Sequence, residues 1–76
     1  MRLIINARPE SGSVLSVLDQ QNVIASYTKF IPEIESTIDQ IFQKWDIEAV
    51  QVIGPTAYTR RFAEYAKTNY PKVEVR

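Results

Sequence analysis

The amino-acid sequence predicts a single α/β domain over residues 1–76, built in the order βββαβαβ. Three observations carry this prediction. Short runs of β-branched and other apolar residues alternate with turn-forming residues, as strands of a sheet do. Two longer segments place apolar residues at helical spacing. The chain length suits one domain, and no repeat or low-complexity segment indicates another architecture.

The first 30 residues predict three strands joined by short connections. Leu3–Ile5 and Val14–Leu18 are apolar runs, and Val23–Phe30 is a third strand of more mixed character. The intervening segments Arg8–Ser13 and Asp19–Asn22 are polar and contain residues that favour turns. Because connections this short join antiparallel neighbours, we expect a meander with the third strand at an edge of the sheet.

The next segment predicts a helix that begins at Ile31-Pro32, since proline is well tolerated in the first helical turn. Its apolar stripe consists of Ile34, Ile38, Ile41, Phe42 and Trp45. We expect Trp45 to extend this stripe into the core rather than to anchor a partner. The polar face carries Glu33, Glu35 and Asp39, which we interpret as solvated carboxylates. A Mg²⁺ or Ca²⁺ site is disfavoured because no loop supplies the remaining oxygen ligands.

The last third of the chain predicts a strand, a helix and a strand. Ala49–Ile53 is the fourth strand, and Gly54-Pro55 turns it directly into a helix from about Thr56 to Asn69. The apolar stripe of this helix is Tyr58, Phe62, Tyr65 and Ala66. The other two tyrosines, Tyr27 and Tyr70, lie outside this stripe, so we expect their side chains to be free of the core. The segment Lys72–Arg76 alternates charged and apolar residues, which predicts a fifth strand at an exposed edge.

The order of these elements determines the expected sheet. Because strand-helix-strand connections are right-handed, we predict the strand order 3-2-1-4-5, with the first, fourth and fifth strands parallel and the second antiparallel to its neighbours. Over the whole chain this order resembles the core of the ribonuclease H-like fold. Nucleases of that fold carry carboxylates where this chain has Asn6 and Gly54, so the resemblance implies no nuclease activity even though Glu35 could match a helix acid. The actin-like ATPases of that fold need a second domain and glycine-rich phosphate loops. A ferredoxin-like arrangement is the alternative, but it needs a helix between the first two strands.

Composition excludes several classes of chemistry. The chain has no cysteine and no histidine, which excludes disulfides, thiolate zinc sites and Ser-His-Asp or Cys-His catalysis within one chain. Nine basic and nine acidic residues cancel, which counts against a protein that coats nucleic-acid duplexes. We therefore predict a protein that is not an enzyme and has no metal or cofactor. The polar turn after Met1–Ile5 and the lack of a long apolar run predict a cytoplasmic protein with no membrane partner.

The turn between the fourth strand and the second helix is the one local feature that suggests a ligand. A helix amino terminus presents free N–H groups and a partial positive charge, which suit a phosphate or carboxylate. The residues of this hypothetical anion site are Gly54, Thr56, Ala57, Arg60 and Arg61. The interpretation that we favour is an ordinary turn in which Thr56 caps the helix and Arg60 pairs with Glu64.

The second strand carries large apolar residues on both of its faces. Both helical connections run in the same direction across the sheet, so both helices should cover one face and leave the other open. We expect either Leu15 and Val17 or Val14 and Leu18 to face the helices, and the other pair to face a partner chain.

Two functional hypotheses follow. The first is a non-catalytic assembly or protein-interaction module that forms a homo-oligomer through the open sheet face, with a dimer as the first guess. The alternative is a binder of a phosphate-bearing ligand, a nucleotide or a nucleic-acid end, at the Gly54–Arg61 turn. A short neutral chain without catalytic residue types is also similar to small accessory proteins of phages and prophages.

Overall fold

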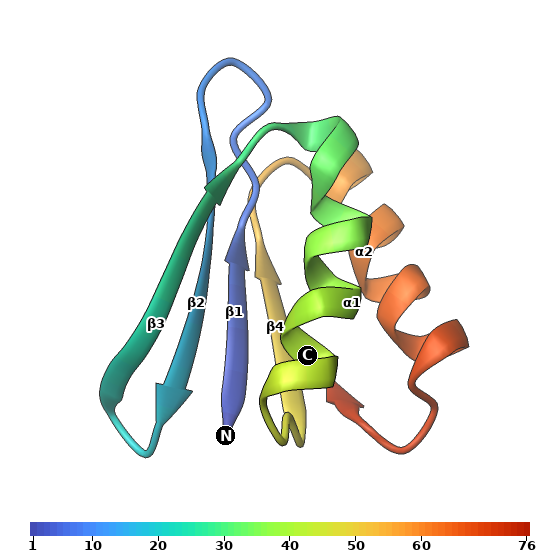
Figure 1. Ribbon diagram of the computed structural model, residues 1–76. Helices are drawn as coiled ribbons and strands as arrows, with labels where there is room; N and C mark the ends of the chain where they lie inside the picture. The colour runs from blue at the N-terminus through green and yellow to red at the C-terminus, as the bar shows by residue number, and fades with distance from the viewer.

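A computed structural model describes all 76 residues and confirms the predicted sheet. Its five strands lie in the order β3-β2-β1-β4-β5 (Figure 1). The strands are β1 (Arg2–Asn6), β2 (Ser13–Asp19), β3 (Asn22–Lys29), β4 (Ala49–Ile53) and β5 (Glu74–Val75). Strand β4 is parallel to both β1 and β5, and β2 is antiparallel to both β1 and β3, as the sequence predicts.

Two helices cover one face of this sheet. Helix α1 (Ile34–Lys44) connects β3 to β4, and helix α2 (Thr56–Asn69) connects β4 to β5. Figure 1 shows both helices on the same side, because the two crossovers run in the same direction across the sheet. Neither helix has the length and apolar character that a membrane-spanning segment needs.

The core lies between the sheet and the two helices. Its twelve buried residues are Leu3, Ile5, Ala7, Leu15, Val17, Ile34, Ile38, Ile41, Ile47, Val50, Phe62 and Ala66. Every second residue of β1 and β2 is buried, as expected for strands covered on one side only. Leu15 and Val17 therefore face the helices, whereas Val14 and Leu18 lie on the opposite face and are half-buried.

The start of the first helix differs from the prediction. Residues Ile31–Glu33 form a 3₁₀ turn (η1), and the α-helix begins only at Ile34. The Glu33 side chain turns back and accepts a hydrogen bond of 3.4 Å from the Phe30 backbone N–H. Pro32 lies in this turn, where its missing N–H leaves no bond unmade. The tighter turn carries the chain from the edge strand onto the helix layer.

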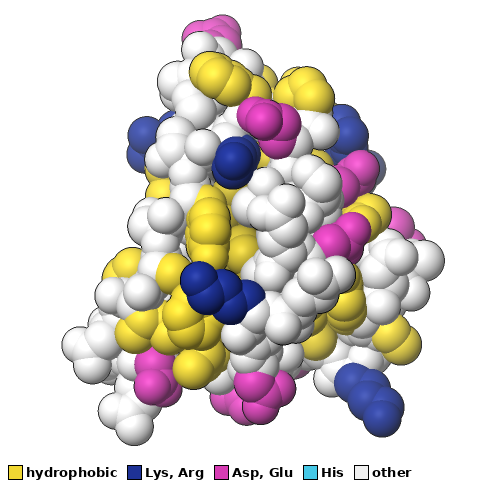
Figure 2. All heavy atoms as spheres, viewed as in Figure 1, with side chains coloured by type: hydrophobic (Ala, Val, Ile, Leu, Met, Phe, Trp, Pro, Cys, Tyr) yellow, Lys and Arg dark blue, Asp and Glu magenta, His cyan; other side chains and the backbone are white.

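Trp45 lies at the edge of the core rather than inside it. The indole is half-buried at the end of α1, and its Nε1 donates a hydrogen bond of 3.4 Å to the Tyr27 hydroxyl of β3. The Lys44 ammonium lies 5.2 Å from the centre of the Trp45 ring. Figure 2 shows hydrophobic side chains along this seam between β3 and α1. The sequence predicted that the Tyr27 side chain would be free. The structure shows instead that it contacts Trp45 and helps to close the seam.

The last strand is shorter than the predicted Lys72–Arg76. Strand β5 contains only Glu74 and Val75, which pair with Ala49 and Val50. The Val73 N–H donates to the Tyr70 carbonyl at 3.0 Å, so the chain is still turning where the strand was expected to begin. As a consequence, the second half of β4 has no strand beside it on this edge of the sheet.

The boundaries of the second strand were also misplaced by one residue. Ser13, predicted to be in the preceding loop, is the first residue of β2 and is fully buried. Its hydroxyl accepts a hydrogen bond of 2.8 Å from the Arg8 backbone N–H. This bond satisfies the buried hydroxyl and closes the loop between β1 and β2.

Candidate functional site

The face of the sheet opposite the helices is covered by no other part of the chain (Figure 1). Paired residues of neighbouring strands point to the same side of a sheet, so the strand registers define three rows across this face. The rows are Gln51, Ile4, Ser16 and Ser26; Ile53, Asn6, Val14 and Thr28; and Ala49, Arg2, Leu18 and Val23. We call these twelve residues the open face. None of them is buried.

The open face is less apolar than the sequence suggested, and it is nearly uncharged. Each row mixes aliphatic side chains with hydroxyl or amide groups or with Arg2, so half of the positions are polar. Arg2 is the only charged member, although 24% of all residues in the chain are charged. Its Nε is buried and makes no hydrogen bond. Depletion of charged side chains is typical of the centre of protein interfaces.

The most exposed aliphatic side chains lie at the ends of the rows. Val23 is 59% exposed and Ile53 is 45% exposed, at opposite edges of the open face. A bulge opposite Val17 and Leu18 inserts Ile24 beside Val23, and Ile24 is 41% exposed. The bulge therefore widens the apolar part of this edge.

The strand-to-helix turn requires glycine at its first position. The Ala7 N–H donates a hydrogen bond of 2.8 Å to the Ile53 carbonyl, which brings the end of β1 against the turn. Gly54 has a φ of 138°, and a Cβ at this residue would lie 2.6 Å from the Ala7 oxygen. Because only glycine fits this backbone and this approach, Gly54 has a structural role.

Thr56 does not cap the second helix, contrary to the prediction. The N-cap is Pro55, which makes no side-chain hydrogen bond, and Thr56 is the first helical residue. The Pro55 carbonyl accepts the N–H groups of Tyr58 and Thr59, both at 3.0 Å. The N–H groups of Thr56 and Ala57 make no backbone hydrogen bond, so the helix start does present two free donors.

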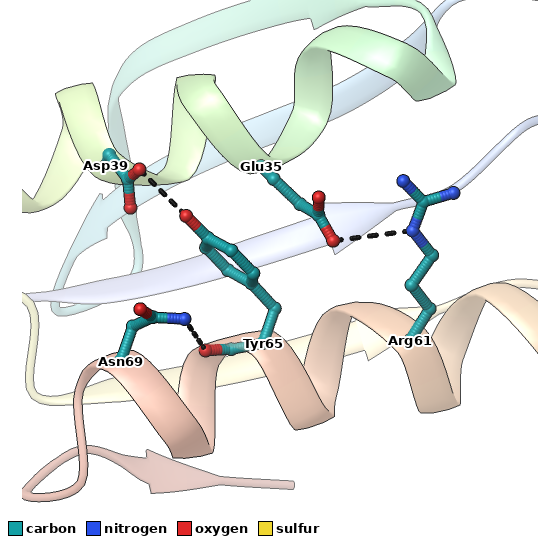
Figure 3. Close-up of polar contacts among 5 residues, drawn as sticks. All are labelled: Glu35, Asp39, Arg61, Tyr65 and Asn69. Carbon is teal, nitrogen blue, oxygen red and sulfur yellow. Dashed lines mark hydrogen bonds and ion pairs between the residues drawn. The ribbon is translucent and has the colours of Figure 1, made fainter.

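The two arginines of the predicted anion site do not converge on this helix start. Arg61 turns toward α1, where its Nε donates to Glu35 Oε2 at 3.3 Å (Figure 3). Arg60 forms no ion pair, and the predicted pair with Glu64 is absent. Ala57, Arg60 and Arg61 line a shared hollow between α2 and the β4 edge of the sheet, whereas Gly54 and Thr56 do not.

Sequence reasoning missed a polar cluster between the helices. Asp39 of α1 was expected to be solvated, but its Oδ2 accepts a hydrogen bond of 2.8 Å from the Tyr65 hydroxyl (Figure 3). Its Oδ1 accepts another, of 2.6 Å, from the Tyr70 hydroxyl. The Tyr70 ring also stacks on Phe42, with ring centres 3.8 Å apart, so Tyr70 is not free. Asp39 lies 26 residues from Tyr65, and no local spacing signals the contact.

The pKa values of Tyr65 and Tyr70 in this cluster are raised above the ordinary value for tyrosine. The hydrogen bond to Asp39, with burial and the nearby carboxylate charge, raises the pKa of Tyr65 to about 12. Burial raises the pKa of Tyr70 further, and its hydrogen bond to Asp39 adds to the effect. Both hydroxyls remain protonated at neutral pH and donate to Asp39. The cluster therefore joins the two helices through hydrogen bonds.

The three carboxylates of the first helix do not converge either. Glu33 accepts from the Phe30 N–H, Glu35 pairs with Arg61, and Asp39 accepts from the two tyrosines. No group of three or more carboxylates in the structure could hold a metal ion.

Comparisons with known proteins show the fold and not the family. No protein-family model and no curated protein matches the chain. A solved structure that is similar is Pelota from Archaeoglobus fulgidus, described as showing inter-domain structural plasticity, with a TM-score of 0.62 and 21% sequence identity. The match covers 99% of this chain and 25% of Pelota, so the chain spans about a quarter of Pelota's length. Nothing in these comparisons shows a ribonuclease H-like match, so that resemblance rests on element order alone.

Proposed function

We propose that the protein is a non-catalytic assembly module that associates with a second copy of itself through the open face. The observation that carries the proposal is the nearly uncharged sheet face, with aliphatic side chains exposed at both of its edges. Outer sheet faces that only meet water normally carry charged side chains, whereas interface centres lack them. With Arg2 as its only charged residue, the open face resembles the centre of an interface in this respect.

A second copy is favoured over an unrelated partner because the open face is complementary to itself. In a twofold-symmetric contact the same patch is present on both sides, and the open face brings only one charge from each copy, that of Arg2. Here the polar members other than Arg2 are serine, threonine, asparagine and glutamine, which can both donate and accept hydrogen bonds. The chain as a whole is neutral, so two copies do not repel at a distance.

The size of the sheet sets the expected strength of this contact. The four strands of the open face, about 4.8 Å apart and about six residues long, give a flat area of roughly 300–400 Å² on each copy. Counted on both copies, this is roughly 600–800 Å², which lies below the roughly 1,200 Å² that stable, specific interfaces bury in total. We therefore expect a dimer that dissociates in the micromolar range or above, and not an obligate one.

The cellular setting is part of the same proposal. We place the module in the cytoplasm, in keeping with the lack of cysteine. Its element order is that of a ribonuclease H-like core without the catalytic carboxylates, and an accessory protein of a phage or prophage is a setting that suits a small assembly module. A different protein partner on the open face is the competing occupant.

Amide chemical shifts followed on dilution, from millimolar to micromolar protein, test the proposal. The shifts of the open face should move with concentration, while those on the outer sides of α1 and α2 should not. The variant Val14→Lys should remain folded and lose the concentration dependence, because a buried unpaired charge opposes the contact. The matched control Gln43→Lys, on an exposed position of α1, should keep it. Shifts that do not change with concentration, or that change only on the helices, would contradict the proposal.

A further inference from the structure

A basic hollow lies between α2 and the edge of the sheet at β4, and it contains no residue of the open face. It has a volume of about 780 Å³. Its lining residues are Val52, Ala57, Thr59, Arg60, Arg61, Ala63, Glu64, Lys67 and Arg76. Ala57 and Ala63 keep the helix side open because their side chains are short, and Val52 belongs to the half of β4 that β5 does not flank.

The charge in this hollow is one-sided. Four cationic side chains line it against the single carboxylate of Glu64, in a chain whose total charge is zero. Arg60 and Lys67 form no ion pair with any carboxylate. Arg61 and Arg76 are ion-paired through Nε with Glu35 and Glu74, so those carboxylates balance their charge, although their terminal nitrogens keep their donors. The positive charge that no ion pair balances therefore lies on Arg60 and Lys67.

The spacing of the free cations indicates the kind of anion that fits. Arg60 and Lys67 are seven residues apart on α2, which places them about 10 Å apart along the helix axis. A nucleic-acid strand carries a phosphate about every 3.4 Å along a duplex axis, so successive phosphates of one strand can contact both cations at once. No aromatic side chain lines the hollow, so it offers no surface on which a base could stack.

We propose that this hollow binds the phosphate backbone of a nucleic-acid strand without reading its sequence. The chain's neutrality counts against wrapping a duplex, but it does not weaken a local contact with a few phosphates. The sequence suggested a phosphate-bearing ligand at the strand-to-helix turn. We place the phosphate contacts about one turn further along α2, at Arg60 and Lys67. The proposal is independent of self-association, because the hollow and the open face share no residue.

Fluorescence anisotropy of a labelled single-stranded oligothymidylate, titrated with the whole protein at low salt, tests this proposal. We expect weak binding that Arg60→Gln with Lys67→Gln reduces by about tenfold or more, with the salt dependence of log K lowered by about 1.4 for two lost phosphate contacts. The matched control, Lys29→Gln with Lys44→Gln, removes two cations that do not line the hollow and should change affinity less than twofold.

Three outcomes would overturn the proposal. The first is no anisotropy change at millimolar protein, and the second is an equal loss in the control variant, which would show general charge attraction only. The third is equal competition by inorganic phosphate and by unlabelled oligothymidylate at the same phosphate concentration, which would show a site for one phosphate. Unchanged circular dichroism of both variants confirms that the comparison is made between folded proteins.

Discussion

Replacing Ile38 by alanine tests whether α1 packs as described. The Ile38 side chain is fully buried at the centre of α1, against the sheet. Removing a buried isoleucine side chain costs about 2–5 kcal/mol, through lost transfer energy and through the cavity left behind. At about 0.05–0.15 kcal/mol per residue, a 76-residue domain has a total stability of roughly 4–11 kcal/mol. The variant should therefore lose a large part of the free energy of unfolding.

Urea unfolding followed by the fluorescence of Trp45, the single tryptophan, measures this loss. The matched control is Gln40→Ala, two residues along the same helix and exposed, which should change the free energy of unfolding by less than about 0.5 kcal/mol. If Ile38→Ala is as stable as Gln40→Ala, then α1 does not bury this face and the assignment of the core is wrong.

Three further predictions concern the turn and the tyrosine cluster. Gly54→Ala should lower the free energy of unfolding by roughly 1–3 kcal/mol or more, because φ is 138° and Ala7 lies against the residue; a urea midpoint equal to wild type would contradict this. Thr56→Ala should be nearly neutral, since Thr56 makes no capping bond, whereas a true cap would cost about 0.5–2 kcal/mol. Between pH 10.0 and about 12 the protein should lose stability, because the Tyr65 pKa is higher in the folded than in the unfolded state. Its contribution is complete below pH 10.0 and disappears as the pH rises through about 12, so urea midpoints should fall less steeply in Tyr65→Phe; parallel curves would refute this.

The order and type of the elements could be predicted because each depends on local pattern. The stripe around Ile38 repeats at helical spacing, and Gly54 marks the end of β4. Sequence could not decide which face of β2 meets the helices, because Val14 to Leu18 places aliphatic residues on both faces. That choice depends on how β2 aligns with β1 and on where the helices cross, which are properties of the assembled chain.

The candidate sites were less predictable than the fold, because they depend on contacts between distant segments. Asp39 meets Tyr65 and Tyr70 only when both helices lie on one face of the sheet. Arg61 lies near the start of α2 in sequence, yet its interaction with Glu35 of α1 draws it away from the predicted anion site. Local spacing describes which residues share a helix face, and packing between helices decides what each face contacts.

The oligomeric state of the wild-type protein tests the central claim most directly. Sedimentation across concentrations from micromolar to millimolar measures the mass of the folded species, whose single chain weighs 8.7 kDa. Self-association through the open face predicts a reversible rise toward twice 8.7 kDa as concentration increases, and Val14→Lys should abolish that rise. A soluble wild-type protein that stays at 8.7 kDa up to millimolar concentration would contradict the proposal that the open face binds a second copy.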